Sequence, residues 1–399
     1  MPLTLTRDRL TWIIYGQLAI FGYWLYGFGP VVPLLRDEQG TSRAVASLHG
    51  TAMAVGGILG GITMPWLVRR FGRTPVLWAG QSALVVAILG LWMAHPVPAT
   101  LACVLVAGAA GTLIVNSVNV ALSAHHGPAA PAAISEANAL TAGVGTISPL
   151  VVGVAVATGL GWRPGLALVA VATPLLALVA FRWRVRTPAA TTAGKHLPVR
   201  RLPRRYWLAW TSILATGSVE VCLNLWVADV LRAHAGAAPG TATAAVSAVV
   251  GGMCVGRIIG TRFALRLPAA RVLLGSLALS VAGFAVLWTA TVAWLAIAGL
   301  IVMGLGNSMH YPLAISLAVD HSDGQPDVAA ARSSYAVGIA FGAAPFVLGA
   351  LADRVGPHPA FLLVLVFLAA SAAVVVPLAR NRDRDSVGGC PATPSPVTG

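Results

Sequence analysis

The sequence has few charged residues for its length. Asp, Glu, Lys and Arg make up 10% of its 399 residues, whereas soluble globular proteins carry about 25%. The mean hydropathy is +0.81 and 57% of the residues are hydrophobic, which indicates a chain that crosses a membrane many times. The net charge of +14 does not indicate a nucleic-acid partner, because most charges lie at the ends of apolar segments, where they signal membrane topology.

Cysteine and the common catalytic motifs are also scarce. The four cysteines show no spacing that resembles a disulfide framework or a metal site. The sequence has no phosphate-binding loop, no His-Glu-x-x-His zinc motif and no Gly-x-Ser-x-Gly nucleophile motif. We therefore expect no enzymatic activity, no metal, no cofactor and no ATP-driven step.

Long apolar segments fill most of the chain. A membrane-spanning helix needs about 20 predominantly apolar residues, and twelve segments meet this requirement. The predicted spans are 11–35, 44–68, 74–94, 97–123, 134–158, 162–183, 206–231, 241–265, 271–290, 292–318, 331–352 and 358–379. The predicted fold is therefore all-α and integral to the membrane.

The basic residues predict the orientation of these spans. An even number of spans places both termini on one side, and the segments on that side hold twenty of the 26 lysines and arginines. The other side holds five, and Arg257 lies inside a span. Because positive residues gather on the cytoplasmic side, we expect a multi-pass protein of the cell membrane with both termini in the cytoplasm.

A tandem repeat divides the chain into two similar halves. A shift of 196 residues overlays Gly56 on Gly252, Gly108 on Gly304 and Pro149 on Pro345 without a gap. The predicted domains are an N-terminal six-helix bundle (1–183), a basic cytoplasmic linker (184–205), a C-terminal six-helix bundle (206–379) and a disordered cytoplasmic tail (380–399). Parallel repeats of six helices are typical of one large class of transporters, whose binding site lies between the halves.

Two further motifs resemble those of the major facilitator superfamily. The loop Arg69-Arg70-Phe71-Gly72-Arg73 lies where that family keeps a Gly-x-x-x-Asp-Arg-x-Gly-Arg loop, and the Pro-x-x-x-Gly patterns at 149–153 and 345–349 are similar to its motif in spans five and eleven. Arg69 replaces the family's Asp, and span four lacks the arginine common in drug–proton antiporters. The resemblance covers essentially the whole chain. It implies two pseudo-symmetric bundles and secondary transport of a small organic molecule by alternating access, by a monomer.

One acid and one base lie deep inside predicted spans. Glu220 lies near the middle of span seven, with Asn224 on the same helix face, and Arg257 lies inside span eight. An intramembrane ionisable residue costs several kcal/mol unless it meets a partner or a water-filled cavity. We interpret Glu220 as a proton-binding or substrate-binding carboxylate; permanent structural pairing with Arg257 is the alternative. Arg257 binds either Glu220, an anionic group of the substrate, or backbone carbonyls.

The resemblance directs spans one, four and ten toward the same cavity. Polar residues on these spans, which we expect to line a mostly apolar pocket or else to join helices, are Tyr23, Tyr26, Asn116, Asn119, Asn307, His310 and Tyr311. Such a pocket suits a polar or zwitterionic molecule.

Charges at the cytoplasmic ends of the spans suggest a latch of inverted sign. The family places span two beside span eleven and span five beside span eight. We hypothesise that Arg69, Arg70 and Arg73 meet Asp323 and Asp327, and that Glu136 meets Arg262 or Arg266. Glu136 overlays Arg332 in the repeat. These pairs would close the cytoplasmic side. The alternative is that the arginines only fix topology, since exposed pairs contribute about 0–1 kcal/mol.

The expected function is thus membrane transport, with the bilayer and a small-molecule substrate as partners. Coupling to protons through Glu220 is one hypothesis. A uniporter or an exporter of drugs or metabolites with the same fold, without proton coupling through Glu220, is the second. A membrane sensor that binds a ligand without moving it is the third, and no attached signalling domain supports it.

Overall fold

The computed structural model describes residues 6–185, 201–264 and 266–387, and every regular element within these ranges is a helix. Twelve helical segments there are long and apolar enough to cross a membrane. The predicted all-α architecture with twelve spans is therefore confirmed. The predicted linker and tail lie largely outside the described residues, at 186–200 and 388–399. The last helix continues to Val387, so the predicted boundary at 379 falls inside it.

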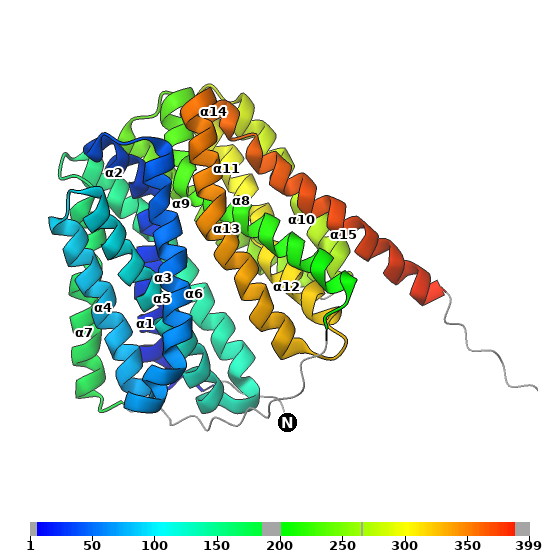
Figure 1. The fold of residues 1–399 in the computed structure, drawn as a ribbon, viewed down its shortest axis with the longest axis horizontal. Helices are drawn as coiled ribbons and strands as arrows, with labels where there is room; N and C mark the ends of the chain where they lie inside the picture. The colour runs from blue at the N-terminus through cyan, green and yellow to red at the C-terminus, as the bar shows by residue number, and fades with distance from the viewer. Residues whose placement is uncertain (1–5, 186–200, 265, 388–399) are drawn as a thin grey trace, which may run out of the picture.

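The first six spans form one bundle and the last six form a second (Figure 1). The N-terminal bundle consists of α1 (Arg9–Phe28), η1 (Gly29–Val31), α2 (Val32–Gln39), α3 (Arg43–Phe71), α4 (Arg73–Met93), α5 (Val97–His126), η2 (Gly127–Ala129), α6 (Ala130–Ala157) and α7 (Arg163–Arg182). The C-terminal bundle consists of α8 (Arg204–His234), α9 (Pro239–Ala264), α10 (Ala269–Thr289), α11 (Ala293–Asn307), α12 (His310–Asp320), α13 (Pro326–Val355), α14 (Pro357–Ala360) and α15 (Leu363–Val387).

We distinguish the two ends of the helix bundles as the termini face and the opposite face. The termini face carries the start of α1 and the turn between α3 and α4, and the opposite face carries the turn between α2 and α3. The bundles lie close together at the opposite face, near α2 and α14, and diverge toward the termini face (Figure 1).

Prolines interrupt two of the spans. Pro33 lacks the N–H that would bond to the carbonyl of Gly29, and the first span narrows to the 3-10 turn η1 at that point. Pro312 has the same relation to Ser308, and the tenth span breaks between α11 and α12 there. Residues on either side of each break therefore do not follow one continuous helical periodicity.

The internal repeat recurs in the helix packing, where equivalent glycines of the two bundles meet equivalent backbone carbonyls. A side chain on Gly56 would collide with the Leu105 carbonyl, and one on Gly108 would collide with the Met53 carbonyl. In the second bundle, Gly252 and Gly304 meet the carbonyls of Ile301 and Val249 in the same way. Each of these residues is 196 positions from its counterpart. Glycine thus brings α3 against α5, and α9 against α11, at backbone distance.

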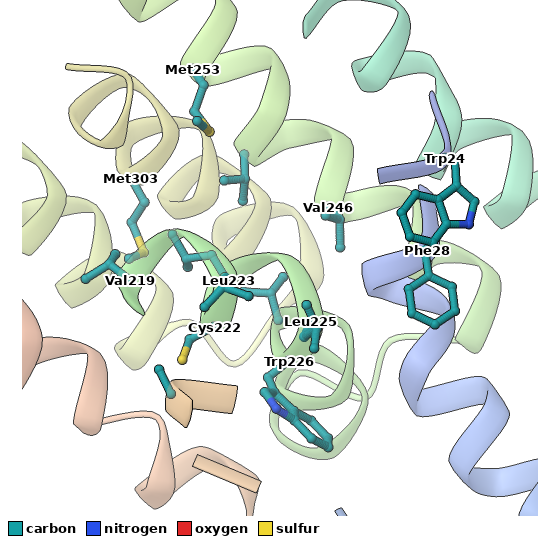
Figure 2. Close-up of a cluster of buried hydrophobic side chains, with 14 of the residues drawn as sticks. Trp24, Phe28, Val219, Cys222, Leu223, Leu225, Trp226, Val246, Met253 and Met303 are labelled. Carbon is teal, nitrogen blue, oxygen red and sulfur yellow. The ribbon is translucent and has the colours of Figure 1, made fainter. Parts of the chain in front are cut away.

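Helix α8 forms the centre of the C-terminal bundle. Its apolar window is 83% buried, the highest value among the described spans. Figure 2 shows Val219, Cys222, Leu223, Leu225 and Trp226 of α8 pointing into a cluster of buried side chains. Val246, Met253 and Met303 enter this cluster from α9 and α11, and Trp24 and Phe28 of α1 lie beside it (Figure 2). Because η1, which continues α1, packs against α8, the first and seventh spans face each other across the bundle interface.

Two glycine contacts join the bundles near the opposite face. On one side, a Cβ on Gly153 of α6 would lie 2.6 Å from the carbonyl oxygen of Gly240 in α9. On the other side, a Cβ on Gly349 of α13 would lie 2.8 Å from the carbonyl oxygen of Arg43 in α3. Gly153 and Gly349 are repeat counterparts. The opposite face is therefore closed by two pseudo-symmetric seams, α6 on α9 and α3 on α13.

Gly153→Val is expected to force the first seam apart, because its methyl groups meet the backbone of α9. Overpacking of this kind costs about 1–3 kcal/mol. Spin labels at Thr158 and Ala238, measured by pulsed electron resonance, should report longer distances than in the parent. Gly143→Val is the matched control, since nothing lies within 4 Å of its Cβ position on the same helix. Equal distances in both variants would contradict the packing described here.

Candidate functional site

A cavity of about 720 Å³ lies between the bundles. Its walls come from α1, α3 and α5 of the N-terminal bundle and from α12 and α13 of the C-terminal bundle. The lining residues of α3 and α13 belong to the middle and the termini half of these helices, for example Ile62 and Ala331. The cavity therefore lies on the side of the midplane where the bundles diverge.

Glu220 of α8 meets polar groups from three other helices. It lies within electrostatic range of Arg257 on α9, of Tyr26 on α1 and of Tyr311 on α12. Arg257 also donates a hydrogen bond to the Tyr26 hydroxyl. Glu220 and Arg257 are both half-buried. The intramembrane acid and base are thus within electrostatic range of each other, and two of the tyrosines named from the sequence lie beside them.

This polar cluster extends across the interface between the bundles. Tyr26 belongs to the N-terminal bundle, whereas Glu220, Arg257 and Tyr311 belong to the C-terminal bundle. The Tyr26 ring packs directly on Gly145 of α6, where a Cβ would collide with it. Any rotation of one bundle against the other must therefore change the contact between Tyr26 and Arg257.

Tyr311 connects the cluster to the cavity. Its side chain lines the cavity, is 42% exposed and lies near Glu220. Asn116 of α5 also lines the cavity and is exposed, and Asn119 is half-buried one turn further along α5. Of the predicted pocket residues on α5 and α12, Asn116 and Tyr311 line the cavity.

Other predicted pocket residues lie inside a single bundle. The Tyr23 hydroxyl donates to the Gly165 carbonyl at 2.7 Å and joins α1 to α7. His310 is 1% exposed and its Nε2 is 3.3 Å from the Ser280 hydroxyl. Asn307 is 2% exposed and donates to the Met253 sulfur at 3.5 Å. These contacts join helices within the bundles and do not place the three side chains in the cavity.

Asn224 lies on the opposite-face side of the cluster. Its side chain presses against Gly29 of η1, at a distance that leaves no room for a Cβ on that glycine. Its Oδ1 is buried and has no hydrogen-bond partner in the described part of the chain. Asn224 thus contacts the break in the first span, where α8 meets the N-terminal bundle.

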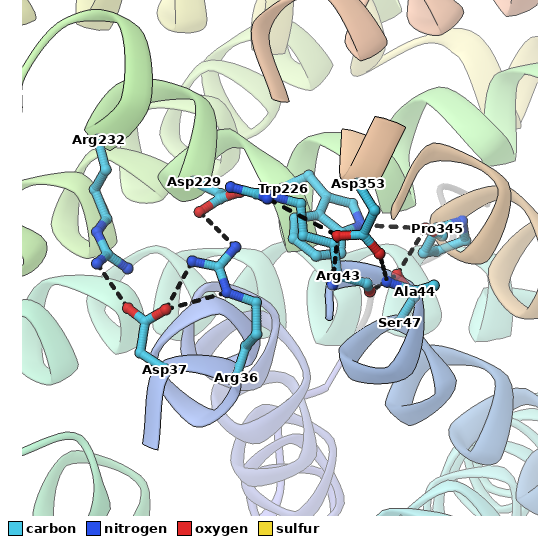
Figure 3. A network of polar contacts seen from close by, with 10 residues as sticks. All are labelled: Arg36, Asp37, Arg43, Ala44, Ser47, Trp226, Asp229, Arg232, Pro345 and Asp353. Carbon is cyan, nitrogen blue, oxygen red and sulfur yellow. Dashed lines mark hydrogen bonds and ion pairs between the residues drawn. The ribbon is translucent and has the colours of Figure 1, made fainter. Parts of the chain in front are cut away.

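A buried ionic network closes the opposite face (Figure 3). The Asp229 carboxylate of α8, whose side chain is 4% exposed, accepts from Arg36 at 2.9 Å and from Arg43 at 2.7 Å. Both arginines come from the N-terminal bundle. Asp37 of α2 binds Arg232 of α8 at 2.6 Å. Removing one partner of a buried pair leaves an uncompensated charge, which costs about 3–5 kcal/mol. We call Arg36, Asp37, Arg43, Asp229 and Arg232 the opposite-face gate.

The C-terminal bundle also caps a helix of the N-terminal bundle. The first backbone N–H groups of α3 have no partner within the helix. Asp353 of α13 accepts the N–H groups of Arg43 and Ala44, each at 2.9 Å, and Ser42 accepts that of Val45. A carboxylate is favoured at this positive end of the helix dipole. Figure 3 shows Asp353 directed at Arg43 and Ala44.

Among the described side chains, none of the predicted latch pairs forms an ion pair in this structure. Glu136 is held within its own bundle by Arg7, whose Nε donates at 2.9 Å, and by the Tyr15 hydroxyl at 3.3 Å. Of the remaining latch residues with described side chains, the following are exposed: Arg69, Arg70, Arg262, Arg266 and Asp323. Arg73 and Arg332 are half-buried. The side chain of Asp327 lies outside the described set.

Sequence reasoning did not identify the opposite-face gate or most of the cavity wall. Asp229 is an acid inside the apolar segment 206–231, which is a usable signal for a buried charge. The cavity residues Trp24, Ser334 and Tyr335 carry no charge and belong to no recognisable motif. Only the three-dimensional structure distinguishes them from ordinary helix-packing residues.

Comparisons with known proteins agree with this architecture. The sequence profile described as Major Facilitator Superfamily matches residues 14–325 and 208–395. A search of curated proteins found no match. Among solved structures, a bacterial homologue of the human lysosomal transporter Spinster, in an inward-facing and unoccupied conformation, is similar at a TM-score of 0.73, with 14% identity over 95% of this chain and 98% of that chain.

Two other solved structures are similar over nearly their whole length. A D-xylose–proton symporter gives a TM-score of 0.73, with 12% identity over 92% of this chain and 95% of that chain. The nucleoside transporter NupG gives a TM-score of 0.71, with 12% identity over 93% of this chain and 97% of that chain. Together with the profile match, the twelve spans and the cavity between two repeated bundles, this likeness leads to one conclusion: the chain belongs to the major facilitator superfamily and is a membrane transporter, not an enzyme.

Proposed function

We propose that this protein carries a small organic molecule across the cytoplasmic membrane by alternating access, and that the structure is its cytoplasm-open state. The termini face then corresponds to the cytoplasm. The distribution of lysine and arginine in the sequence supports this orientation, because the segments predicted to share a side with the termini hold twenty of the 26.

The observation that carries this proposal is the unequal closure of the two faces. At the opposite face, the bundles are joined by backbone-level glycine contacts, by the gate and by the cap on α3. Toward the termini face they diverge around the cavity. A transporter needs a second state in which this asymmetry is reversed, so the contacts that close the opposite face must be breakable. Ion pairs and hydrogen bonds between rigid bundles meet this requirement.

The proposed coupling centre is the cluster of Glu220, Arg257, Tyr26 and Tyr311. Its members come from both bundles, so its energy depends on how the bundles are oriented. A proton on Glu220, or a polar group of the substrate, changes the charge that Arg257 meets and thereby biases the two states differently. Such a difference in interaction energy is what couples binding to a conformational change. The D-xylose–proton symporter among the structural neighbours shows that this fold supports proton coupling.

In the same transport cycle, we propose that the cytoplasmic latch forms when the termini face closes. When the termini face closes, Glu136 would exchange Arg7 for Arg262 or Arg266, and the arginines at 69–73 would meet Asp323 and Asp327, with Arg332 beside them. The present contact between Glu136 and Arg7 would then belong to the open state of that face.

The coupling centre is tested by a thermal-stability screen of the purified protein against metabolites and antibiotics at two pH values. A true ligand at 100 times its Kd should stabilise the parent by about 2.7 kcal/mol. We expect Glu220→Gln and Arg257→Ala to lose most of this stabilisation. Tyr23→Phe is the control, because its hydroxyl bonds within the N-terminal bundle. Hits should then be transported by the parent in proteoliposomes.

The same variants separate the alternative mechanisms. If Glu220→Gln still transports but no longer responds to a pH gradient, Glu220 carries the coupling proton. If it binds more weakly and keeps its pH response, Glu220 is a substrate ligand in a uniporter or exporter. Full binding and transport by both variants would show that Glu220 and Arg257 form a structural pair only.

Asp229→Asn is expected to open the opposite face. The variant keeps the side-chain size but leaves Arg36 and Arg43 without their shared carboxylate, a loss of about 3–5 kcal/mol for a buried pair. Spin labels at Thr158 and Ala238 should show a new population at longer distance. Glu38→Gln is the matched control, because Glu38 binds Arg163 within one bundle. An unchanged distance distribution in Asp229→Asn would mean that the gate does not hold this face closed.

The latch is tested by exchanging charges. Arg70→Glu and Asp327→Arg should each impair transport of a confirmed hit, because like charges then oppose closure of the termini face. The double variant should recover a large part of the rate, since the pair is restored with reversed sign. Impaired single variants without recovery in the double variant would refute the pairing.

A further inference from the structure

The cavity wall is chemically different from the polar cluster beside it. None of the described residues that line the cavity is an acid, a lysine, an arginine or a histidine. Its polar groups are the hydroxyls of Thr112, Ser334, Tyr311 and Tyr335 and the amide of Asn116, and aliphatic and aromatic side chains form the rest. A charged ligand would find no counter-ion on this wall, whereas an uncharged ligand with an apolar body would match it.

One wall residue offers an unused hydrogen-bond donor. Trp24 lines the cavity and is fully buried, and its indole Nε1 has no hydrogen-bond partner among the described residues. A buried N–H without a partner is costly. The nitrogen itself has almost no accessible surface, so a carbonyl, ether or hydroxyl oxygen on a bound molecule would satisfy this group only after the neighbouring wall side chains shift.

The cavity lies against one flank of the molecule. Its lining includes long stretches of α3 and α13. Near the opposite face these helices are joined, because Ser47 donates to the Pro345 carbonyl at 2.8 Å and Thr51 donates to the Gly342 carbonyl at 2.6 Å. Further toward the termini face their contacts end. A Cβ on Gly338 of α13 would still touch Ile58 of α3, at 3.9 Å, whereas one on Gly61, about one turn further along α3, would meet only Thr112 of α5 and no atom of α13 within 4 Å. We call this parted region, between Gly61 and Gly338, the α3–α13 slot.

The slot lies at the depth of the hydrocarbon. Helix α3 has 29 residues, or about 43 Å at 1.5 Å per residue, and the hydrocarbon is about 30 Å thick. A centred helix therefore extends about 7 Å beyond the hydrocarbon at each end. Ile62 on α3 and Tyr335 on α13 are each nine residues from the termini-side end of their helix, or about 14 Å. Both line the cavity and are exposed, at 70% and 64%, although they lie well inside the apolar layer.

We propose that the transported molecule is an uncharged amphiphile that reaches the cavity from the bilayer through the α3–α13 slot. This inference rests on the proposed transport function and adds the substrate class and its route. The oxygen-bearing end of the molecule lies against Trp24, Asn116 and Tyr311, and its apolar body lies against Ile58 and Ile62. A polar or zwitterionic substrate, which the sequence favoured, does not match the uncharged wall.

The route is tested by labelling one cavity cysteine with two reagents. Ser334→Cys is introduced into a chain whose four cysteines are replaced, and the protein is placed in phosphatidylcholine nanodiscs. N-(1-pyrenyl)maleimide partitions into the bilayer, and a sulfonated maleimide stays in water. Gly338→Leu and Gly61→Leu fill the slot from either helix. Each should slow pyrenyl labelling about tenfold and leave sulfonated labelling unchanged.

Gly338→Ala is the matched control for the blocking variants, because its Cβ fits at 3.9 Å from Ile58, and it should label like the parent. Size-exclusion profiles and Tm values identify any variant that fails to fold, and two independent blocking positions keep the test decisive. Pyrenyl labelling that is unaffected by both leucines, or slowed equally with the sulfonated reagent, would overturn the lateral route. Because labelling requires no transport, this result is independent of the proposed transport cycle.

The substrate class is tested by protection of the same cysteine. Prodan is uncharged, aromatic and carries a carbonyl oxygen, and 2-naphthalenesulfonate is an anion with the same ring system. Prodan should protect Ser334→Cys from the sulfonated maleimide, and Trp24→Phe should weaken this protection about threefold to tenfold, as expected for one neutral hydrogen bond. Equal or better protection by the anion would overturn the assignment to uncharged molecules.

Discussion

The structure depends on a single carboxylate that two arginines of the other bundle share. Asp229 is almost fully buried, and Arg36 and Arg43 reach it from either side of the turn between α2 and α3. A buried acid of this kind is stable only while its partners are present. The α2–α3 turn therefore holds the C-terminal bundle in place at this face. The same turn determines where α3 begins. The opening of the cavity on the other side follows from this closure.

The polar cluster and the opposite-face gate join the two bundles at different depths and by different chemistry. The gate uses full charges near the membrane surface, where water can replace lost partners when the bundles separate. The cluster around Glu220 lies deeper, and its link to the N-terminal bundle is the phenol of Tyr26. A neutral hydroxyl can leave Arg257 without stranding a second charge in an apolar layer. In the proposed cycle, this arrangement would keep the acid and the base together in one bundle while the other bundle moves past them.

Much of the fold was predictable from the sequence. The length of each apolar segment reflects the thickness of the bilayer and so predicts the spans, and the 196-residue repeat predicts two similar bundles. Glu220 and Arg257 were also identified, since charged residues at that depth are conspicuous. Asn307 and His310 were assigned by helical periodicity through a span that breaks before Pro312. The break changes the facing direction, so Tyr311 lines the cavity and its two neighbours turn into the bundle. The partners of Asp229 lie more than 180 residues away, and no local pattern points to them.

The cap on α3 makes the two seams of the opposite face unequal. The repeat counterpart of Asp353 is Ala157, which has no carboxylate, and the counterpart of Arg43 is Pro239, which has no backbone N–H to be satisfied. A proline at the first position of a helix needs no such partner. Separation of α3 from α13 therefore uncovers two helix-end amides that Asp353 had satisfied, whereas the α6–α9 seam has no carboxylate at the equivalent position. The duplicated bundles thus share a common architecture, but their two seams do not have the same chemistry: opening the α3–α13 seam costs a cap on a helix end, and opening the α6–α9 seam does not.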